Sequence, residues 1–158
     1  KLLKTGKSKT PDTFVDFFNP LLSHLRKKTM KLETVPVSIF KSNHEVFEFL
    51  VDIKNFEKLM PENIKEFSAN NDTFSFSLAG IPEIKLKLKE KVSPIKITLG
   101  AVSDKLDFSL TVELKSLSEN STSAQLLFEG EFNPMMAMML KKPLTNFIET
   151  LGKNLQDL

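Results

Sequence analysis

The chain contains few residues of the types that usually carry catalysis or bind metals. It has no cysteine and only two histidines, His24 and His44. A thiolate nucleophile, a disulfide and a thiolate metal site are therefore impossible within it. Neither histidine has a carboxylate and a second ligand at the spacing of a metal site. We expect both histidines to be surface or capping residues, and we predict no metal ion and no cofactor.

Motifs for phosphate binding and for hydrolysis are also missing from the sequence. With five glycines there is no glycine-rich phosphate loop, and no serine lies in a G-x-S-x-G stretch. Glu129 and Glu131 are close in sequence, but strand alternation places them opposite Phe128 and Phe132. Carboxylates that act as acid and base must converge on a pocket. We therefore predict that this pair faces solvent, and we assign no catalytic residue.

The strongest charge pattern is a run of alternating lysines, Lys85, Lys87, Lys89 and Lys91. A period of two places all four on one outer face of a strand. Acidic residues nearby make this surface mixed, and the phenylalanines have the opposite parity. The net charge of +2 is too small to indicate a polyanionic partner. The pattern is that of a solvated face, and we predict no nucleic-acid binding.

Residues 133–158 predict one long amphipathic helix. Asn133 can cap its start, and Pro134 then occupies the first helical position. Pro143 lies inside the pattern and should kink or break the helix. The first turns are rich in methionine, whose flexible side chain suits either core filling or an adaptable wall. The apolar residues that recur at spacings of three and four are Met136, Leu140, Leu144, Phe147, Ile148, Leu151 and Leu155.

The remainder predicts mainly strands. Residues 31–40 alternate and form the first strand, and a capping box of Ser42 and Glu45 begins a helix. A second short helix over 53–59 follows. Further strands are predicted over residues 64–69, 73–78, 84–92, 96–99, 107–117 and 124–132. Their short connections favour antiparallel neighbours, with one apolar and one polar face of the sheet.

This order of elements resembles the helix-grip fold of the START-like, or SRPBCC, superfamily. Two stretches carry the resemblance further, DIKNFEKLMPENIKEF at 52–67 and GEFNPMMAMMLKKPLTNFIETLGKNL at 130–155. The second is similar to small SRPBCC proteins of Bacteroidetes bacteria. The resemblance implies an α+β fold of the order β-α-α-β6-α, in which a curved antiparallel sheet of about seven strands wraps on the C-terminal helix. It covers residues 30–158, which we predict to be one START-like domain.

Residues 1–29 lie outside the resemblance and are predicted to be an extension or upstream sequence. The first nine residues form a basic tail. Residues 13–28 place apolar side chains on one helical face, namely Phe14, Phe17, Phe18, Leu21, Leu22 and Leu25. This segment could contact a membrane surface or a partner protein, or dock on its own domain. No apolar run is long enough for a membrane span or a secretory signal, so the expected location is cytoplasmic.

The resemblance also implies a cavity between the sheet and the helix. We expect a hydrophobic or amphipathic, lipid-like small molecule to bind there, although the same residues would look alike in a filled core. One alternative is a cyclase- or dehydratase-like enzyme, which needs polar groups inside the cavity. The other is a protein-interaction module with a filled core. The predicted ligand-binding residues are Phe74, Phe76, Leu78, Leu86, Leu88, Phe108, Leu110, Val112, Leu126, Phe128, Met136, Met139, Leu140 and Phe147.

Overall fold

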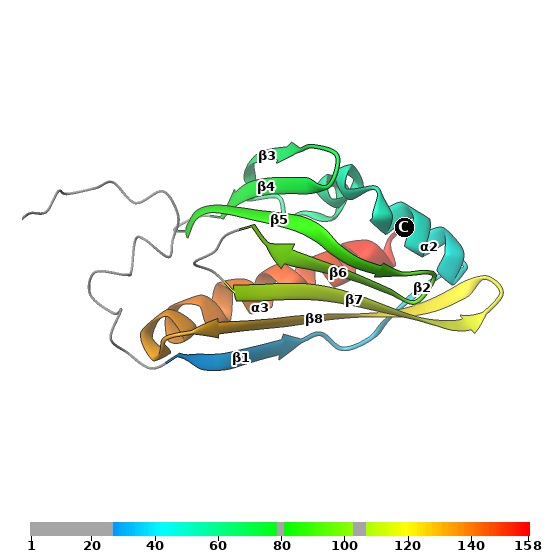
Figure 1. The fold of residues 1–158 in the computed structure, drawn as a ribbon. Coiled ribbons are helices and arrows are strands. Elements are labelled where there is room, and N and C mark those ends of the chain that lie inside the picture. The colour runs from blue at the N-terminus through cyan, green and yellow to red at the C-terminus, as the bar shows by residue number, and fades with distance from the viewer. Residues whose placement is uncertain (1–26, 79–80, 103–106) are drawn as a thin grey trace, which may run out of the picture.

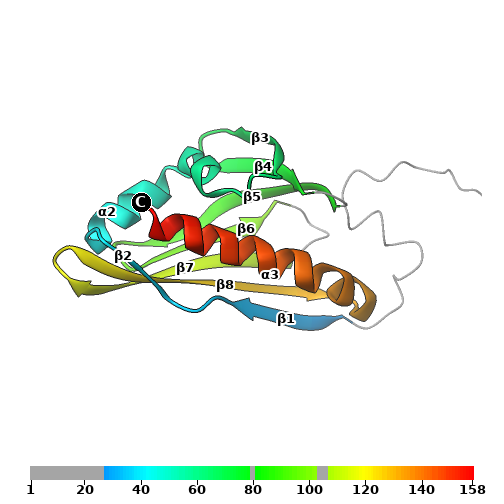
Figure 2. The ribbon, with the colours of Figure 1, turned by 180° about the vertical axis from the view of Figure 1, so that it is seen from behind.

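A computed structural model describes residues 27–78, 81–102 and 107–158. In these ranges one antiparallel sheet of eight strands carries a long helix across one face (Figures 1 and 2). The strands are β1 (Lys28–Glu33), β2 (Val37–Ile39), β3 (Lys65–Ala69), β4 (Thr73–Leu78), β5 (Ile81–Val92), β6 (Lys96–Ala101), β7 (Asp107–Ser118) and β8 (Ser121–Phe132). The helices are α2 (Asn43–Val51), the 3₁₀ helix η1 (Ile53–Leu59) and α3 (Pro134–Gln156). The predicted α+β helix-grip architecture is confirmed.

The strand predicted over residues 31–40 is divided into β1 and β2. The sheet order is β1-β8-β7-β6-β5-β4-β3, and β2 also pairs with β8, so the strand number rises from about seven to eight. Between β1 and β2, the Thr34 backbone N–H donates to the Leu126 carbonyl at 3.0 Å. The Leu126 N–H donates in turn to the Thr34 hydroxyl at 3.1 Å. A side-chain oxygen thus takes the place of a backbone carbonyl where the edge strand leaves the ladder.

Replacing Thr34 by valine should lower the free energy of unfolding by about 1–3 kcal/mol. Valine keeps the shape but removes the acceptor, so the buried Leu126 N–H would lose its partner. Denaturation followed by far-ultraviolet circular dichroism measures the change. Thr29→Val is the matched control, because the Thr29 hydroxyl donates to the Glu131 carboxylate in an exposed position on β1. Equal stability of the two variants would contradict the role assigned to Thr34.

The predicted helix starts are confirmed in the described residues. Ser42 and Glu45 form the reciprocal capping box of α2. The Asn133 side chain caps α3 by accepting from the Met136 N–H at 2.9 Å. Pro143 was predicted to kink or break α3, and the break is wrong, since the helix is continuous from Pro134 to Gln156. Buried side chains before and after the proline, such as Leu140 and Leu144, hold both halves against the sheet, and this packing outweighs the missing backbone hydrogen bond.

The lysines of β5 do not all share one face. The pairing of β5 with β6 shifts register between Leu88 and Glu90, which marks a β-bulge or irregularity. Beyond it, Lys91 lies opposite Ile97, whose side chain is in the core. Opposed residues of an antiparallel pair share a face, so Lys91 extends from the inner face, at the solvent-exposed end of the strand. The period-two prediction is therefore wrong for Lys91, although all four lysines are exposed.

Candidate functional site

Phenylalanines form two stacked rows on the inner face of the sheet. In the first row, Phe74 stacks on Phe56, Phe67 and Phe76 with ring centroids 5.2, 5.5 and 6.0 Å away. Phe76 then stacks on Phe147 of α3 at 5.1 Å. In the second row, Phe128 stacks on Phe108 at 5.4 Å and on Phe132 at 6.3 Å. Aromatic side chains without a polar atom thus connect the sheet to the covering helix.

A small apolar cavity lies where the two rows approach α3. It is lined by Phe76, Ile84, Leu86, Phe108, Leu110, Phe128, Phe132, Leu140, Leu144, Phe147 and Ile148. The volume open to the centre of a water-sized sphere is about 20 Å³. A single water needs roughly 10–15 Å³ by this measure. The interior described here is therefore nearly filled and has no room for a lipid-like molecule without movement of its walls.

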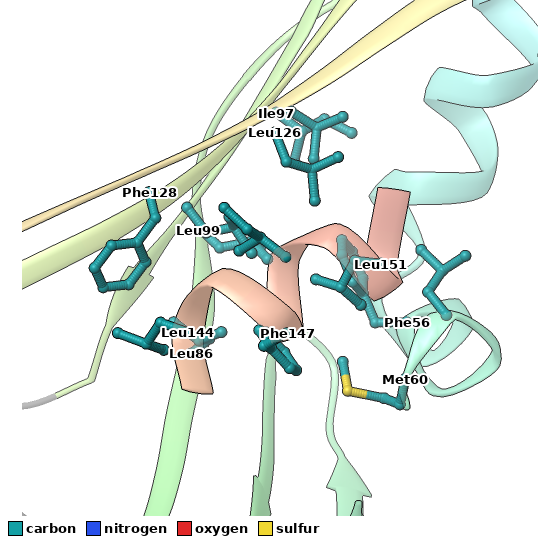
Figure 3. Packing of buried hydrophobic residues seen from close by; sticks show 14 of the residues in the cluster. Phe56, Met60, Leu86, Ile97, Leu99, Leu126, Phe128, Leu144, Phe147 and Leu151 are labelled. Atoms are coloured by element: carbon teal, nitrogen blue, oxygen red, sulfur yellow. The ribbon is translucent and has the colours of Figure 1, made fainter. Parts of the chain in front are cut away.

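Helix α3 and one glycine shape this cavity. The helical period places Leu140, Leu144 and Phe147 on the side of α3 that faces the sheet, and Figure 3 shows Leu144 and Phe147 projecting from α3 among side chains of the sheet and η1. Opposite them, a Cβ atom on Gly130 would lie 2.8 Å from the Phe132 ring. Only glycine leaves the space that this ring occupies, so Gly130 allows the second row to close against the strand.

The structure brings half of the predicted ligand-binding residues together. Those that line the cavity are Phe76, Leu86, Phe108, Leu110, Phe128, Leu140 and Phe147. Phe74, Val112, Leu126 and Met136 are buried in the core without lining it, and Leu88 is only partly buried beside the core. Leu78 lines an external groove instead. These residues have the predicted inward parity, but parity does not show how far along the sheet the cavity extends.

Met139 is the clearest correction to the predicted site. Its side chain is exposed on the outer side of α3, away from the cavity. The first turns of α3 are apolar nearly all round, so the sequence could not show which methionines face inward. Successive helical residues differ by about 100°. Because Leu140 faces the sheet, Met139 must turn away from it.

Four cavity residues are not among the predicted ligand-binding residues, namely Ile84, Phe132, Leu144 and Ile148. The signal for each was present. Ile84 has the parity of Leu86, and Phe132 has the parity of Phe128. Leu144 and Ile148 continue the helical spacing from Leu140. All four belong to the apolar faces predicted from the sequence, so the full faces include them.

An open groove adjoins the cavity on the outside. It is lined by Pro61, Asn63, Leu78, Lys142, Pro143, Asn146, Phe147 and Thr150. By the same measure its volume is about 340 Å³, within the range typical of small-molecule sites. Its floor is apolar, while Asn63, Lys142 and Asn146 are exposed at its rim. Phe147 lines both spaces and is the partition between them.

The chemistry available at the cavity is limited. Every described residue that lines it is apolar. Among the described residues, no group of three or more histidines and carboxylates is placed to hold a metal ion. His44 is exposed on the first turn of α2, and His24 lies outside the described residues. None of the described helices combines the length and hydrophobicity required to cross a membrane.

Comparison with known proteins identifies the fold. No protein-family model and no curated protein matches the sequence. Norcoclaurine synthase from Thalictrum flavum, solved in complex with dopamine and hydroxybenzaldehyde, matches with a TM-score of 0.67 at 12% identity over 99% of this chain and 94% of that chain. A START superfamily protein from Mycobacterium smegmatis matches with a TM-score of 0.57 at 15% identity over 84% and 95%. The chain has a START-like fold.

The same fold is found in further bacterial proteins. The protein XoxI from Bacillus cereus matches with a TM-score of 0.61 at 11% identity, over 84% of this chain and 94% of that chain. The START-like fold is thus shared with proteins whose sequences differ widely from this one. Identities this low establish the architecture alone, so function has to be argued from the residues of the cavity and the groove.

Proposed function

We propose that the protein binds a small amphipathic, lipid-like molecule between the sheet and α3. The apolar part of the molecule would enter the space lined by the phenylalanine rows. Its polar end, for which we propose an acidic group, would lie in the groove. The observation that carries this proposal is the position of Phe147, which lines both the small apolar cavity and the open groove. Displacement of this one ring would join the two spaces.

The partition lies in a part of α3 with a weakened backbone. Pro143 has no N–H, so the carbonyl of Met139 lacks its usual partner within the helix. Phe147 follows one turn later and contacts Phe76 by stacking rather than by a hydrogen bond. Both features favour a shift of this region over a shift of the sheet, whose strands are joined to their neighbours by backbone hydrogen bonds. Binding therefore requires α3 or the Phe147 side chain to move, because a cavity of about 20 Å³ is too small for a lipid-like molecule.

The groove favours an acidic head group. Lys142 supplies an ammonium group, and Asn63, Asn146 and Thr150 supply neutral polar atoms at the rim. Burial of an alkyl chain would supply most of the affinity, at about 0.8 kcal/mol per buried CH₂. An exposed ion pair adds only about 0.2–1 kcal/mol. A fatty acid or a similar carboxylic acid fits this combination.

Catalysis receives less support from the cavity. Norcoclaurine synthase, with which the fold is shared, is an enzyme by name. General acid and base catalysis requires a titratable group at the reacting atoms, and the described residues lining the cavity here are all apolar. The stronger competitor is an interaction module with a filled core, which the small cavity volume favours.

Titration with dodecanoate and with dodecanol below their aggregation limits separates these hypotheses. We expect isothermal titration calorimetry to detect binding of both to the full chain. Lys142→Ala should weaken dodecanoate binding about two- to fivefold and leave dodecanol unchanged. Lys153→Ala is the control, since Lys153 is exposed on the same helix outside the groove. Absence of binding by either compound, with no adduct in native mass spectrometry after mild purification, would favour the filled core.

A further inference from the structure

The first turns of α3 expose three methionines. Met135 is 49% exposed, Met138 76% and Met139 52%. We call Met135, Met138 and Met139 the methionine face. On the other side of the same turns, Met136 and Leu140 are buried against the sheet. A cluster of large apolar side chains on a surface indicates a contact site rather than a solvated helix, and no described residue covers this one.

The N-terminal segment leaves the sheet beside this face. Strand β1 begins at Lys28, which is paired with Phe132, the last residue of β8. Asn133 follows Phe132 and caps α3. The start of β1 and the start of α3 therefore lie side by side at one end of the sheet (Figures 1 and 2). Residues 13–26 are therefore attached to the chain at this end of the sheet, with Lys27 as the single residue between them and β1.

The segment has an apolar face of its own. Residues 1–26 lie outside the described residues, so the argument uses their sequence. At 100° per residue, Asp16 and Ser23 fall on the side opposite the apolar positions. An apolar stripe of this width requires a partner surface. The apolar positions are Phe14, Phe17, Phe18, Leu21, Leu22 and Leu25.

We propose that residues 13–26 dock through this apolar stripe on the methionine face of α3. The attachment at Lys28 favours this occupant over any external one, because a short tether gives an effective concentration of about millimolar. Methionine side chains adapt to the shape of a partner, which suits contact with several phenylalanines and leucines. The argument uses no residue that lines the cavity or the groove, because Met135, Met138 and Met139 line neither of them.

Nuclear magnetic resonance of methionine methyl groups tests the docking in the full chain. The protein has six methionines, and single Met→Leu variants assign their signals. A soluble gadolinium chelate broadens the methyl signals that solvent reaches. In the wild type we expect the signals of the methionine face to be as protected as that of Met60, which is buried. The double variant Phe18→Asn, Leu22→Asn should increase their relaxation enhancement about threefold or more and leave Met60 unchanged.

The matched control is the double variant Asp16→Asn, Ser23→Asn, which alters the same segment on its polar side. It should leave all methyl signals as in the wild type. Full exposure of the methionine face in the wild type, or an equal response to both double variants, would overturn the proposal. Protection that disappears on dilution would instead indicate a second copy of the chain. Protection that requires vesicles of phosphatidylglycerol and phosphatidylcholine would indicate a membrane surface, and either result would also overturn it.

Discussion

Replacing Leu110 by arginine should lower the free energy of unfolding by about 3–5 kcal/mol and abolish dodecanoate binding. Leu110 is 2% exposed and lines the cavity between the phenylalanine rows. No polar side chain lines that space among the described residues. A guanidinium group there would be buried without a partner, which costs far more than the packing that leucine provides.

The measurement is guanidinium denaturation followed by circular dichroism, since the chain has no tryptophan or tyrosine for fluorescence. Ser109→Arg is the matched control, because Ser109 precedes Leu110 on the other face of β7 and pairs with Glu129. It should change stability by less than about 0.5 kcal/mol. If the arginine variant fails to fold, Leu110→Ala replaces it. Its free energy of unfolding is expected to be lower than that of the wild type by about 2–5 kcal/mol. Unchanged stability in either variant would show that Leu110 does not face the core.

Replacing Phe147 by alanine should lower the free energy of unfolding by about 3–5 kcal/mol and create a pocket that admits indole. Truncation would remove the partition, so the new space would connect the 20 Å³ cavity with the 340 Å³ groove. An apolar cavity of this kind binds small aromatic molecules. At indole concentrations about tenfold above the dissociation constant, binding should raise the free energy of unfolding of the variant by about 1.4 kcal/mol. Thermal denaturation with and without indole measures both effects.

Phe74→Ala separates the role of the partition from simple loss of volume. Phe74 is as deeply buried and belongs to the same row, but it does not line the cavity. Its truncation should lower the free energy of unfolding by a similar amount. It should leave a closed space about the size of one phenyl ring, which is too small for indole. If indole stabilised both variants equally, or neither, Phe147 would not be the partition between cavity and groove.

The fold was largely predictable because its local signals agree with its tertiary contacts. Strand β4 and helix η1 have the predicted bounds, and Ser42 and Asn133 cap helices as predicted. The exceptions depend on long-range contacts. Thr34 accepts from an N–H on a strand 92 residues away, and the register shift in β5 depends on its pairing with β6. A single sequence does not show such partners, so neither feature could be read from local periodicity.

The candidate site was less predictable than the fold. Strand alternation correctly predicted that Phe76 and Leu110 face inward. It predicted the same for Val112 and Leu126, which are buried in the core but do not line the cavity. The size of a void is the small difference between the volume that the curved backbone encloses and the volume that the side chains fill. No residue pattern encodes this difference directly. The groove was missed entirely, because it joins Asn63 after η1 to Lys142 on α3. These residues come together only once the chain has folded.

The pairing of β1 with β8 has a consequence for the time course of folding. Met30 lies opposite Gly130, so β1, the first described strand in sequence, can pair only after β8, the last one, has been made. Strands β5 to β8 pair with their sequence neighbours and can form earlier. During synthesis β1 therefore has no partner until β8 has left the ribosome. We expect the edge formed by β1, together with the start of α3 beside it, to be the last part of the protein to become ordered.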